Sequence, residues 1–192
     1  MTGDPVLEAV LTRRSSTRLT EPAPGREELL ELVQAAATAP DHGRIRPWRL
    51  IALEGEDRAL LGEALREAAP DHEQARHAAA KPMRAPLLLS IVFCPDLDHP
   101  TVPEWEQLVA VAAMVQTLLL LLHSRGWGAI WRTGAAVEAP QVHKHLGITE
   151  DEQLLGWLYI GARADGPAAR AREPFDVRPR VRWSRPTGHS MP

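Results

Sequence analysis

Cysteine is almost absent from this chain of 192 residues, in which Cys94 stands alone. A single cysteine excludes an internal disulfide framework and is compatible with a reducing compartment. The first five residues, Met1 to Pro5, lack the basic and then apolar segments of a secretory signal peptide. We therefore expect a cytoplasmic protein.

An excess of either charge is also missing, because the formal net charge is only −3. This favours neither nucleic acid nor an anionic membrane as the main partner. Long apolar runs are absent as well: the most apolar stretch, residues 108–122, has 15 residues, where a membrane span needs about 18. The hydrophobic content of 44% still suffices for one compact core, so we expect a single domain over residues 1–192.

Apolar periodicity, capping residues and breakers predict alternating helices and strands. Because these elements follow no regular βαβ repeat, they indicate an α+β fold with helices on both faces of a mixed sheet. The segment 161–192 is rich in Pro and Arg and is predicted to be an extended tail. Helices are expected at 5–12, 57–68, 72–80, 103–124 and 139–146, and strands at 48–53, 86–93, 128–131 and 154–160. A further helix between Gly25 and Pro40 should bury Leu29, Leu30, Leu32, Val33 and Ala36.

The longest expected helix is apolar nearly all the way round between Leu108 and Leu122, so it should be buried nearly all the way round. Burial against a second copy of the chain is the simpler arrangement, helped by the small side chains of Ala110, Ala112 and Ala113. The alternative is the central helix of a monomer.

The segment Arg13-Arg14-Ser15-Ser16-Thr17-Arg18 follows the first helix and combines three guanidiniums with three hydroxyls. A dianionic phosphate needs such charge-assisted and hydroxyl donors. A solvated basic turn and a phosphorylation site are the alternatives.

Two other polar segments flank predicted strands, Ala39-Pro-Asp-His-Gly-Arg-Ile-Arg-Pro-Trp48 and Gly126-Trp-Gly-Ala-Ile-Trp-Arg-Thr-Gly134. The second is no dinucleotide fingerprint, because its first glycine follows a helix and not a strand. Asp96, Asp98 and His99 lie between Pro95 and Pro100, with Cys94 just before them, which favours a loop, so we expect no metal site.

Taken in chain order, these segments and Trp105-Glu106-Gln107 resemble the short FMN-dependent nitroreductases, in particular the YdjA-like NAD(P)H nitroreductase subgroup. The resemblance spans roughly residues 5–165. It implies an α/β/α sandwich with a central mixed, mainly antiparallel sheet, and a homodimer formed through long helices with two FMN molecules at the interface. It also implies that the C-terminal tail reaches across to the partner subunit.

The implied activity is transfer of reducing equivalents from NAD(P)H through FMN to a nitroaromatic, quinone or similar small-molecule acceptor, in a ping-pong cycle. The flavin carries the chemistry, so no catalytic side chain is expected. The alternatives are a non-catalytic FMN-binding or phosphorylation-regulated interaction protein, and a family member with other flavin chemistry such as dehalogenation.

The resemblance also implies site residues. Arg13, Arg14 and Ser15 match the segment that holds the FMN phosphate and ribityl chain, Thr38 and His42 a loop that reaches the flavin from the partner, and Trp131, Arg132 and Thr133 the segment beside the isoalloxazine ring. The NAD(P) segment would be Leu121, Leu122, His123, Ser124, Arg125 and Gly126.

This chain departs from the larger family members at two places. They usually carry a basic residue four positions after the first Arg, where this chain has Thr17 followed by Arg18. They often carry Asn and Gln before the Pro-Trp pair, where this chain has Asp41, His42 and Arg46. We therefore expect different contacts at the pyrimidine edge of the flavin.

Overall fold

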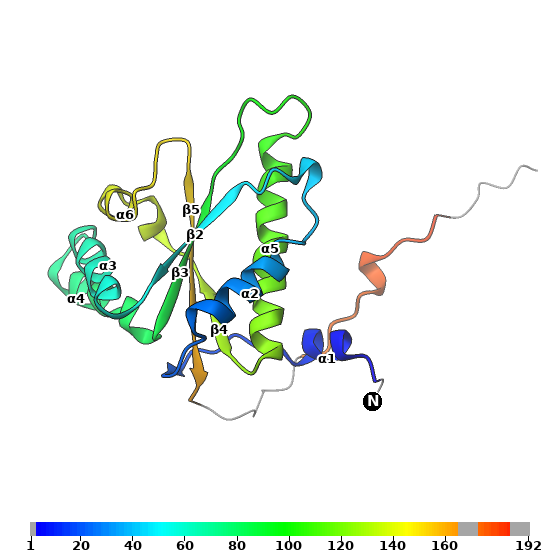
Figure 1. Cartoon of the computed structure of the whole chain (residues 1–192), viewed down its shortest axis with the longest axis horizontal. Helices are drawn as coiled ribbons and strands as arrows, with labels where there is room; N and C mark the ends of the chain where they lie inside the picture. Colours follow the sequence, from blue (N-terminus) through cyan, green and yellow to red (C-terminus); the bar gives the residue numbers. More distant parts are fainter. Residues whose placement is uncertain (1–2, 165–172, 185–192) are drawn as a thin grey trace, which may run out of the picture.

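A computed structural model describes residues 3–164 and 173–184 of the chain. Its centre is a five-stranded sheet in which every described strand pair is antiparallel. The long strand β5 lies in the middle and pairs with β1, β3 and β4, and β2 forms an edge beside β3 (Figure 1). The strands are β1 (Leu19–Thr20), β2 (Trp48–Leu53), β3 (Leu87–Phe93), β4 (Gly128–Arg132) and β5 (Gln153–Arg163).

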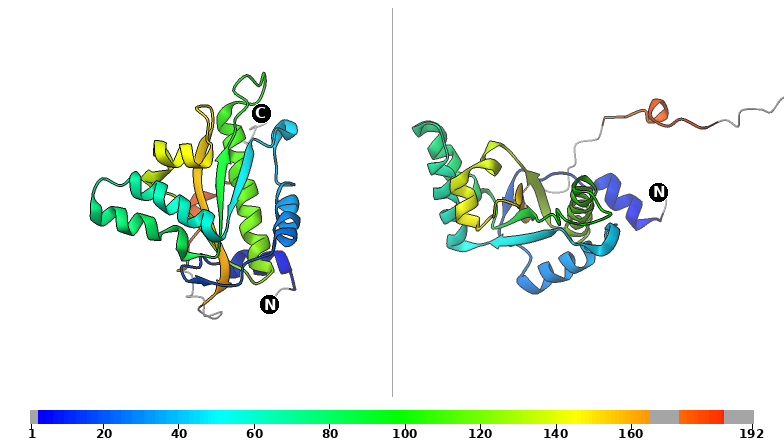
Figure 2. Two further views of the ribbon diagram at one scale, coloured as in Figure 1. Left: turned by 60° about the vertical axis from the view of Figure 1, so that its left-hand side comes forward. Right: turned by 90° about the horizontal axis from the view of Figure 1, so that it is seen from above.

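Helices cover both faces of this sheet (Figure 2). On one face, Leu32 and Leu118 belong to a buried apolar cluster with Ile160 of β5; on the other, Leu61 and Val142 belong to a second cluster. The α+β sandwich expected from the sequence is therefore confirmed. The helices are α1 (Pro5–Thr12), α2 (Arg26–Ala36), α3 (Gly55–Glu67), α4 (His72–Ala80), α5 (Glu104–Ser124) and α6 (Pro140–Leu146).

Helix α1 shows why local signals placed several boundaries correctly. The Asp4 carboxylate accepts hydrogen bonds from the backbone N–H groups of Val6 (2.9 Å) and Leu7 (3.1 Å), and Pro5 has no N–H to satisfy. At the other end of the fold, α6 stops at Gly147, which adopts the left-handed conformation with φ of 60°.

One predicted burial and one predicted boundary differ from the structure. Leu30 was expected on the buried side of α2 but is 53% exposed, because only one side of this helix faces α5 and the sheet. The C-terminal tail was expected to begin at Gly161, but β5 continues to Arg163, where Leu19 of β1 pairs with it. The sheet therefore takes in residues that composition alone assigned to the tail.

Within one chain, helix α5 is buried on one side only, so the alternative of a central helix enclosed in a monomer is wrong, and burial of its other side against a second copy stays a prediction. Its inner side includes Val111, Met114 and Leu118, which have almost no exposed surface, whereas Val109 is 57% exposed. The helix has 21 residues and is long and apolar enough to cross a membrane by length and composition alone, with 44% of that stretch buried inside the domain.

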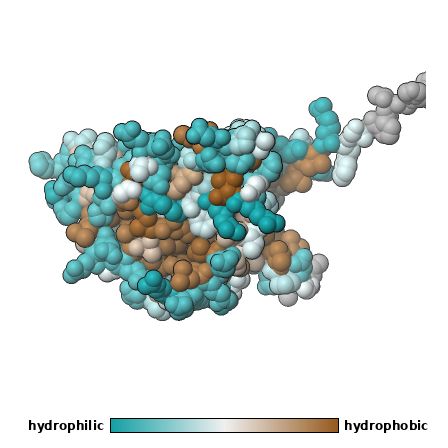
Figure 3. Space-filling model, turned by 45° about the horizontal axis from the view of Figure 1, so that its top comes forward, coloured by the Kyte–Doolittle hydropathy of each residue, from teal (hydrophilic) through white to brown (hydrophobic). Residues whose placement is uncertain are grey.

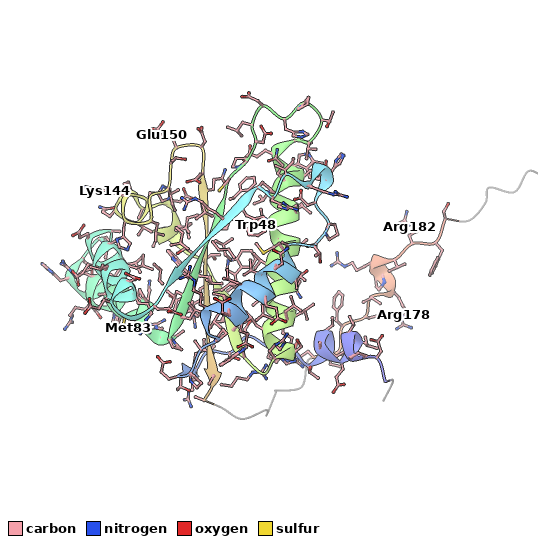
Figure 4. All side chains as sticks on the ribbon, in the orientation of Figure 1. Trp48, Met83, Lys144, Glu150, Arg178 and Arg182 are labelled. Atoms are coloured by element: carbon pink, nitrogen blue, oxygen red, sulfur yellow. The ribbon has the colours of Figure 1, made fainter. Side chains whose placement is uncertain are left out.

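The C-terminal segment 173–184 lies clear of the sandwich on the side of α1 (Figure 1). Its side chains are exposed throughout, including Trp183, which is 85% exposed. Arg178 and Arg182 project from this segment at a distance from the sheet (Figure 4). Within the described residues 3–164 and 173–184, no surface covers these apolar and basic side chains.

Candidate functional site

The predicted phosphate segment, residues 13–16, follows α1 and lies against the beginning of β4. The Ser16 N–H donates to the carbonyl of Ala129 at 3.1 Å. Gly128 permits this close approach, since a Cβ there would lie 2.7 Å from Leu19 Cδ2, 2.9 Å from Arg163 Cγ and 3.1 Å from Ser16 Cβ. The segment and β4 are thus packed backbone to backbone at this end of the sheet.

The two arginines of the segment have different surroundings. One terminal nitrogen of Arg14, NH1, donates to the carbonyls of Leu11 (2.7 Å) and Arg13 (2.9 Å), so it caps the last turn of α1. Arg13 contributes positive charge that acts on His123. Helix capping and phosphate binding therefore compete for the donors of Arg14.

His123, predicted as part of an NAD(P) segment, contacts the end of α1. Its Nε2 lies 2.8 Å from the hydroxyl of Thr12, and that hydroxyl donates to the carbonyl of Glu8 at 2.7 Å. The Thr12 oxygen must then accept from Nε2–H, which leaves Nδ1 as the acceptor that faces the guanidinium of Arg163. The contacts select one neutral tautomer of the ring.

The electrostatic surroundings of His123 agree with this tautomer. Burial, together with the charges of Arg163, Arg13 and Arg14, lowers the pKa of His123 below its ordinary value. The Arg163 guanidinium contacts this imidazole and the charges of Arg13 and Arg14 act on it, so positive charge is concentrated where the sequence predicts a phosphate.

The rest of the predicted NAD(P) segment is mostly engaged within the chain. Leu122 has no exposed surface and lies in the core, so it offers nothing to a nucleotide. The Ser124 hydroxyl donates to the Leu121 carbonyl at 2.8 Å, and Arg125 pairs with Glu31 at 2.6 Å. Gly126, with φ of 88°, turns the chain from α5 toward β4.

A cavity of about 580 Å³ opens at the other end of β4, between that strand and helices α3 and α4. Arg132 and Thr133 of the predicted flavin segment line it, and Trp131 contributes to its rim. The described lining contains no acidic residue but three cations, Lys81, Arg84 and Arg132. This size and the mixture of apolar and cationic groups are typical of a pocket for an anionic or electron-rich small molecule.

Two polar atoms in the walls of this cavity have no hydrogen-bond partner among the described residues. They are Nε of Arg132 and the indole Nε1 of Trp157, and both are buried. A buried donor without an acceptor is destabilising unless a ligand or water satisfies it. Both nitrogens have almost no solvent-accessible surface, so they lie behind the cavity wall and are not presented to a ligand.

Trp131 and Arg132 point to opposite faces of the sheet, as neighbours on a strand must. The Trp131 indole faces the α5 side and donates to the Leu155 carbonyl at 2.9 Å, whereas Arg132 enters the cavity beside Tyr159. Gly156 allows the end of β4 to pass closely, since a Cβ there would lie 2.3 Å from the Arg132 carbonyl oxygen. The two side chains cannot both contact the same face of one flavin ring.

Thr38 and His42 lie away from this cavity, beside a second cavity of about 400 Å³ lined by residues 37–41, Gln34, Arg44 and Arg46. His42 Nδ1 lies 2.8 Å from Glu106 of α5, and Arg44 and Arg46 adopt left-handed conformations with φ of 56° and 52°. The linings of the two cavities share no residue. Within one chain, Thr38 and His42 are therefore not brought to Arg132.

The sequence interpretation missed four residues of the larger cavity and of the cationic cluster around His123. Lys81, Arg84 and Trp157 line the larger cavity, and Arg163 joins the cationic cluster. They come from a short 3-10 turn near α4 and from β5, and no local motif distinguishes them from ordinary surface or core residues. Alternation along β5 could have placed Trp157 and Tyr159 on one face, but not opposite Arg132.

Comparison with known proteins agrees with these features. The model of the Nitroreductase family matches residues 10–162. The chain is 36% identical over 159 residues to "Putative NAD(P)H nitroreductase YdjA" of Escherichia coli strain K12, covering 81% of this chain and 86% of that protein. A nitroreductase-like family protein from Bacillus cereus superposes with a TM-score of 0.82 at 24% identity, covering 96% and 98% of the two chains. The FMN and NADPH-dependent nitroreductase NfnB from Sphigopyxis sp. strain HMH superposes with a TM-score of 0.72 at 19% identity, covering 93% and 98%.

Proposed function

The chain belongs to the nitroreductase family of oxidoreductases, and on this premise we propose that it is an FMN-dependent NAD(P)H oxidoreductase. The observation that carries the proposal is the position of two complementary sites along β4. Positive charge from arginine side chains lies at its beginning, and a cavity lined by Lys81, Arg84 and Arg132 lies at its end.

The two sites share one face of the strand. Gly128, Ile130 and Arg132 alternate onto the side that faces α3 and α4, and the four residue steps between the first and the last span about 13 Å. A ligand with an anionic group at one end, an extended linker and a planar ring at the other end fits this arrangement. FMN has this form, with its phosphate directed to Arg13 and Ser15 and its ring to the cavity of Arg132.

When bound, FMN supplies the redox chemistry, accepting a hydride from NAD(P)H and delivering reducing equivalents to an acceptor. The part of this chain is to hold and orient the cofactor. Arg13, Arg14 and Ser15 would hold the phosphate, and Lys81, Arg84 and Arg132 would place positive charge beside the ring, where it would stabilise negative charge. Neither role needs a proton to leave a side chain.

We also propose a homodimer. The exposed side of α5 carries Leu108 and Val109, and the nearby α1 exposes further apolar side chains, among them Leu7 and Leu11. A hydrophobic region framed by hydrophilic residues is visible on one face of the molecule (Figure 3). Exposed apolar surface of this kind marks a protein interface. A partner subunit would then bring its own copy of the 38–46 loop to the flavin, which one chain does not do.

The open side of the ring would accept the nicotinamide and then, after its departure, an electron acceptor such as a nitroaromatic or a quinone. We propose that nicotinamide and acceptor contact the flavin in turn, as a ping-pong cycle requires.

The visible spectrum of the purified protein tests this function. We expect flavin absorbance near 450 nm at about one FMN per chain, and bleaching on addition of NADH or NADPH without oxygen. A colourless protein that takes up no FMN contradicts the proposal. A yellow protein that neither nucleotide bleaches would instead be a flavin-binding protein without this activity.

A further inference from the structure

Arg163, the last residue of β5, lies beside the segment that we propose for the FMN phosphate. A Cβ on Gly128 would lie 2.9 Å from Arg163 Cγ and 3.1 Å from Ser16 Cβ, so the stem of Arg163 and the segment meet over the beginning of β4. Arg163 thus lies where the FMN phosphate is proposed to bind, and not at the cavity proposed for the flavin ring.

The guanidinium of Arg163 is held in place by hydrogen bonds, but not all of its N–H donors have a partner. Its NH2 donates to the Trp127 carbonyl at 3.2 Å and faces Nδ1 of His123. Its Nε is buried and has no hydrogen-bond partner among the described residues. A phosphate oxygen, like a carboxylate oxygen, is an acceptor that a guanidinium binds through short and charge-assisted contacts.

His123 determines where this guanidinium lies. The ring is fixed between Thr12 of α1 and Arg163, and it can accept from Arg163 only while Nδ1 carries no proton. Because the imidazole is neutral, it orients the guanidinium without neutralising its charge, as a carboxylate would. The full positive charge stays available for an anion.

We propose that Arg163, oriented by His123, is a further phosphate-binding residue beside Arg13 and Ser15, and that it makes this chain select FMN over riboflavin. This inference rests on the proposed function, since it concerns the same cofactor. It also accounts for a departure seen in the sequence: Thr17 stands where larger family members usually carry a basic residue, and the end of β5 supplies the cation from elsewhere in the chain.

The test compares FMN with riboflavin, which has the same ring but no phosphate. Apo-protein is titrated with each flavin by fluorescence quenching for the wild type, Arg163→Gln, Arg163→Lys, His123→Gln and the surface control Arg66→Gln, whose guanidinium pairs with Glu63 on α3. We expect Arg163→Gln to lose at least about tenfold in FMN affinity and to keep its riboflavin affinity. Arg163→Lys should recover part of the loss, His123→Gln should show a smaller loss, and Arg66→Gln none.

Inorganic phosphate gives a second readout that does not depend on the ring. It should compete with FMN for the wild type and compete more weakly for Arg163→Gln. The proposal is overturned if Arg163→Gln weakens both flavins equally or neither. If the Gln variant does not fold, Arg163→Lys decides, and an unchanged ratio of FMN to riboflavin affinity overturns the proposal.

These outcomes separate the inference from the proposed function. Wild-type protein that binds FMN more tightly than riboflavin, with an unaltered ratio in the Arg163 variants, overturns only the role of Arg163. Wild-type protein that binds neither flavin overturns both.

Discussion

The guanidinium of Arg132 lies over the ring of Tyr159, with Cζ 5.6 Å from the ring centroid. Burial raises the pKa of Tyr159, and the nearby charges of Arg132 and Arg84 oppose that rise only in part. The phenol is therefore neutral at ordinary pH, and its face supports a cation at the wall of the larger cavity. This contact places a charge where the flavin ring is proposed to lie.

Replacing Arg132 should consequently affect ring binding and not phosphate binding. We expect Arg132→Ala to weaken FMN and riboflavin by a similar factor, about tenfold, because a charged donor to the ring is lost. Tyr159→Phe is the matched control, since it keeps the aromatic face and should leave both affinities unchanged. Flavin titration of the apo-proteins measures this, and a loss confined to FMN would move Arg132 to the phosphate end.

Arg13 should show the opposite pattern. Arg13→Ala removes one charge-assisted contact to the phosphate, which we expect to cost about 1.5–3 kcal/mol, or roughly 10–150-fold in FMN affinity. Riboflavin affinity should not change. Arg26→Ala, at an exposed position in the first turn of α2, is the control. Unchanged FMN affinity in the Arg13 variant would place the phosphate elsewhere.

The exposed side of α5 predicts a dimer at micromolar concentration. Ala112 lies on that side, so Ala112→Glu should give monomers or aggregates, because an unpaired charge in an apolar interface is strongly disfavoured. Ala59→Glu, at an exposed position of α3, should remain dimeric. Sedimentation velocity distinguishes these states, and a monomeric wild type would contradict both the dimer and the interfacial position of the flavin.

The C-terminal segment provides a separate prediction. Phe175, Val177, Val181 and Trp183 are exposed in the single chain, and a second subunit would give them a surface to dock on. Deletion of residues 174–192 should then weaken dimerisation or release flavin. The measurements are the dimer dissociation constant and the FMN content of the purified protein. If both survive the deletion, the segment is not part of the assembly.

The ion pair of Arg49 with Glu152 predicts acid sensitivity. Two guanidinium hydrogen bonds, of 2.7 and 2.8 Å, hold the pKa of Glu152 down to about 2 from its ordinary 4.5. A lowered pKa means that the carboxylate stabilises the fold above pH 4.5, and that this stability is lost as the pH falls toward 2.

Glu152→Gln should therefore lower the free energy of unfolding by about 1–3 kcal/mol at pH 7, with a difference from wild type that shrinks below pH 4. Glu63→Gln, which removes an exposed pair with Arg66, should change stability little. Urea unfolding at pH 7 and pH 3 tests this. A difference that is equal at both values would show that the charge of Glu152 is not responsible.

Local sequence patterns were sufficient to predict the positions of most helices and strands. Asp4 and Pro5 specify the start of α1, and the apolar run that ends at Leu53 specifies β2, because capping and strand alternation act between near neighbours. The order of the Arg-Arg-Ser, Pro-Trp and Trp-Arg-Thr segments likewise indicated the family, and the match of the family model to residues 10–162 confirms it.

Only the tertiary structure decided which side chains share a site. Apolar periodicity shows that Leu30 and Val109 favour burial, but whether a surface exists to cover them depends on how many helices one chain packs on each face. Thr12, His123 and Arg163 meet because α1, α5 and β5 end at the same place, a consequence of packing that no spacing along the chain encodes. Strand alternation separated Trp131 from Arg132 for the same kind of reason: a motif continuous in sequence is divided between two faces once it enters a sheet.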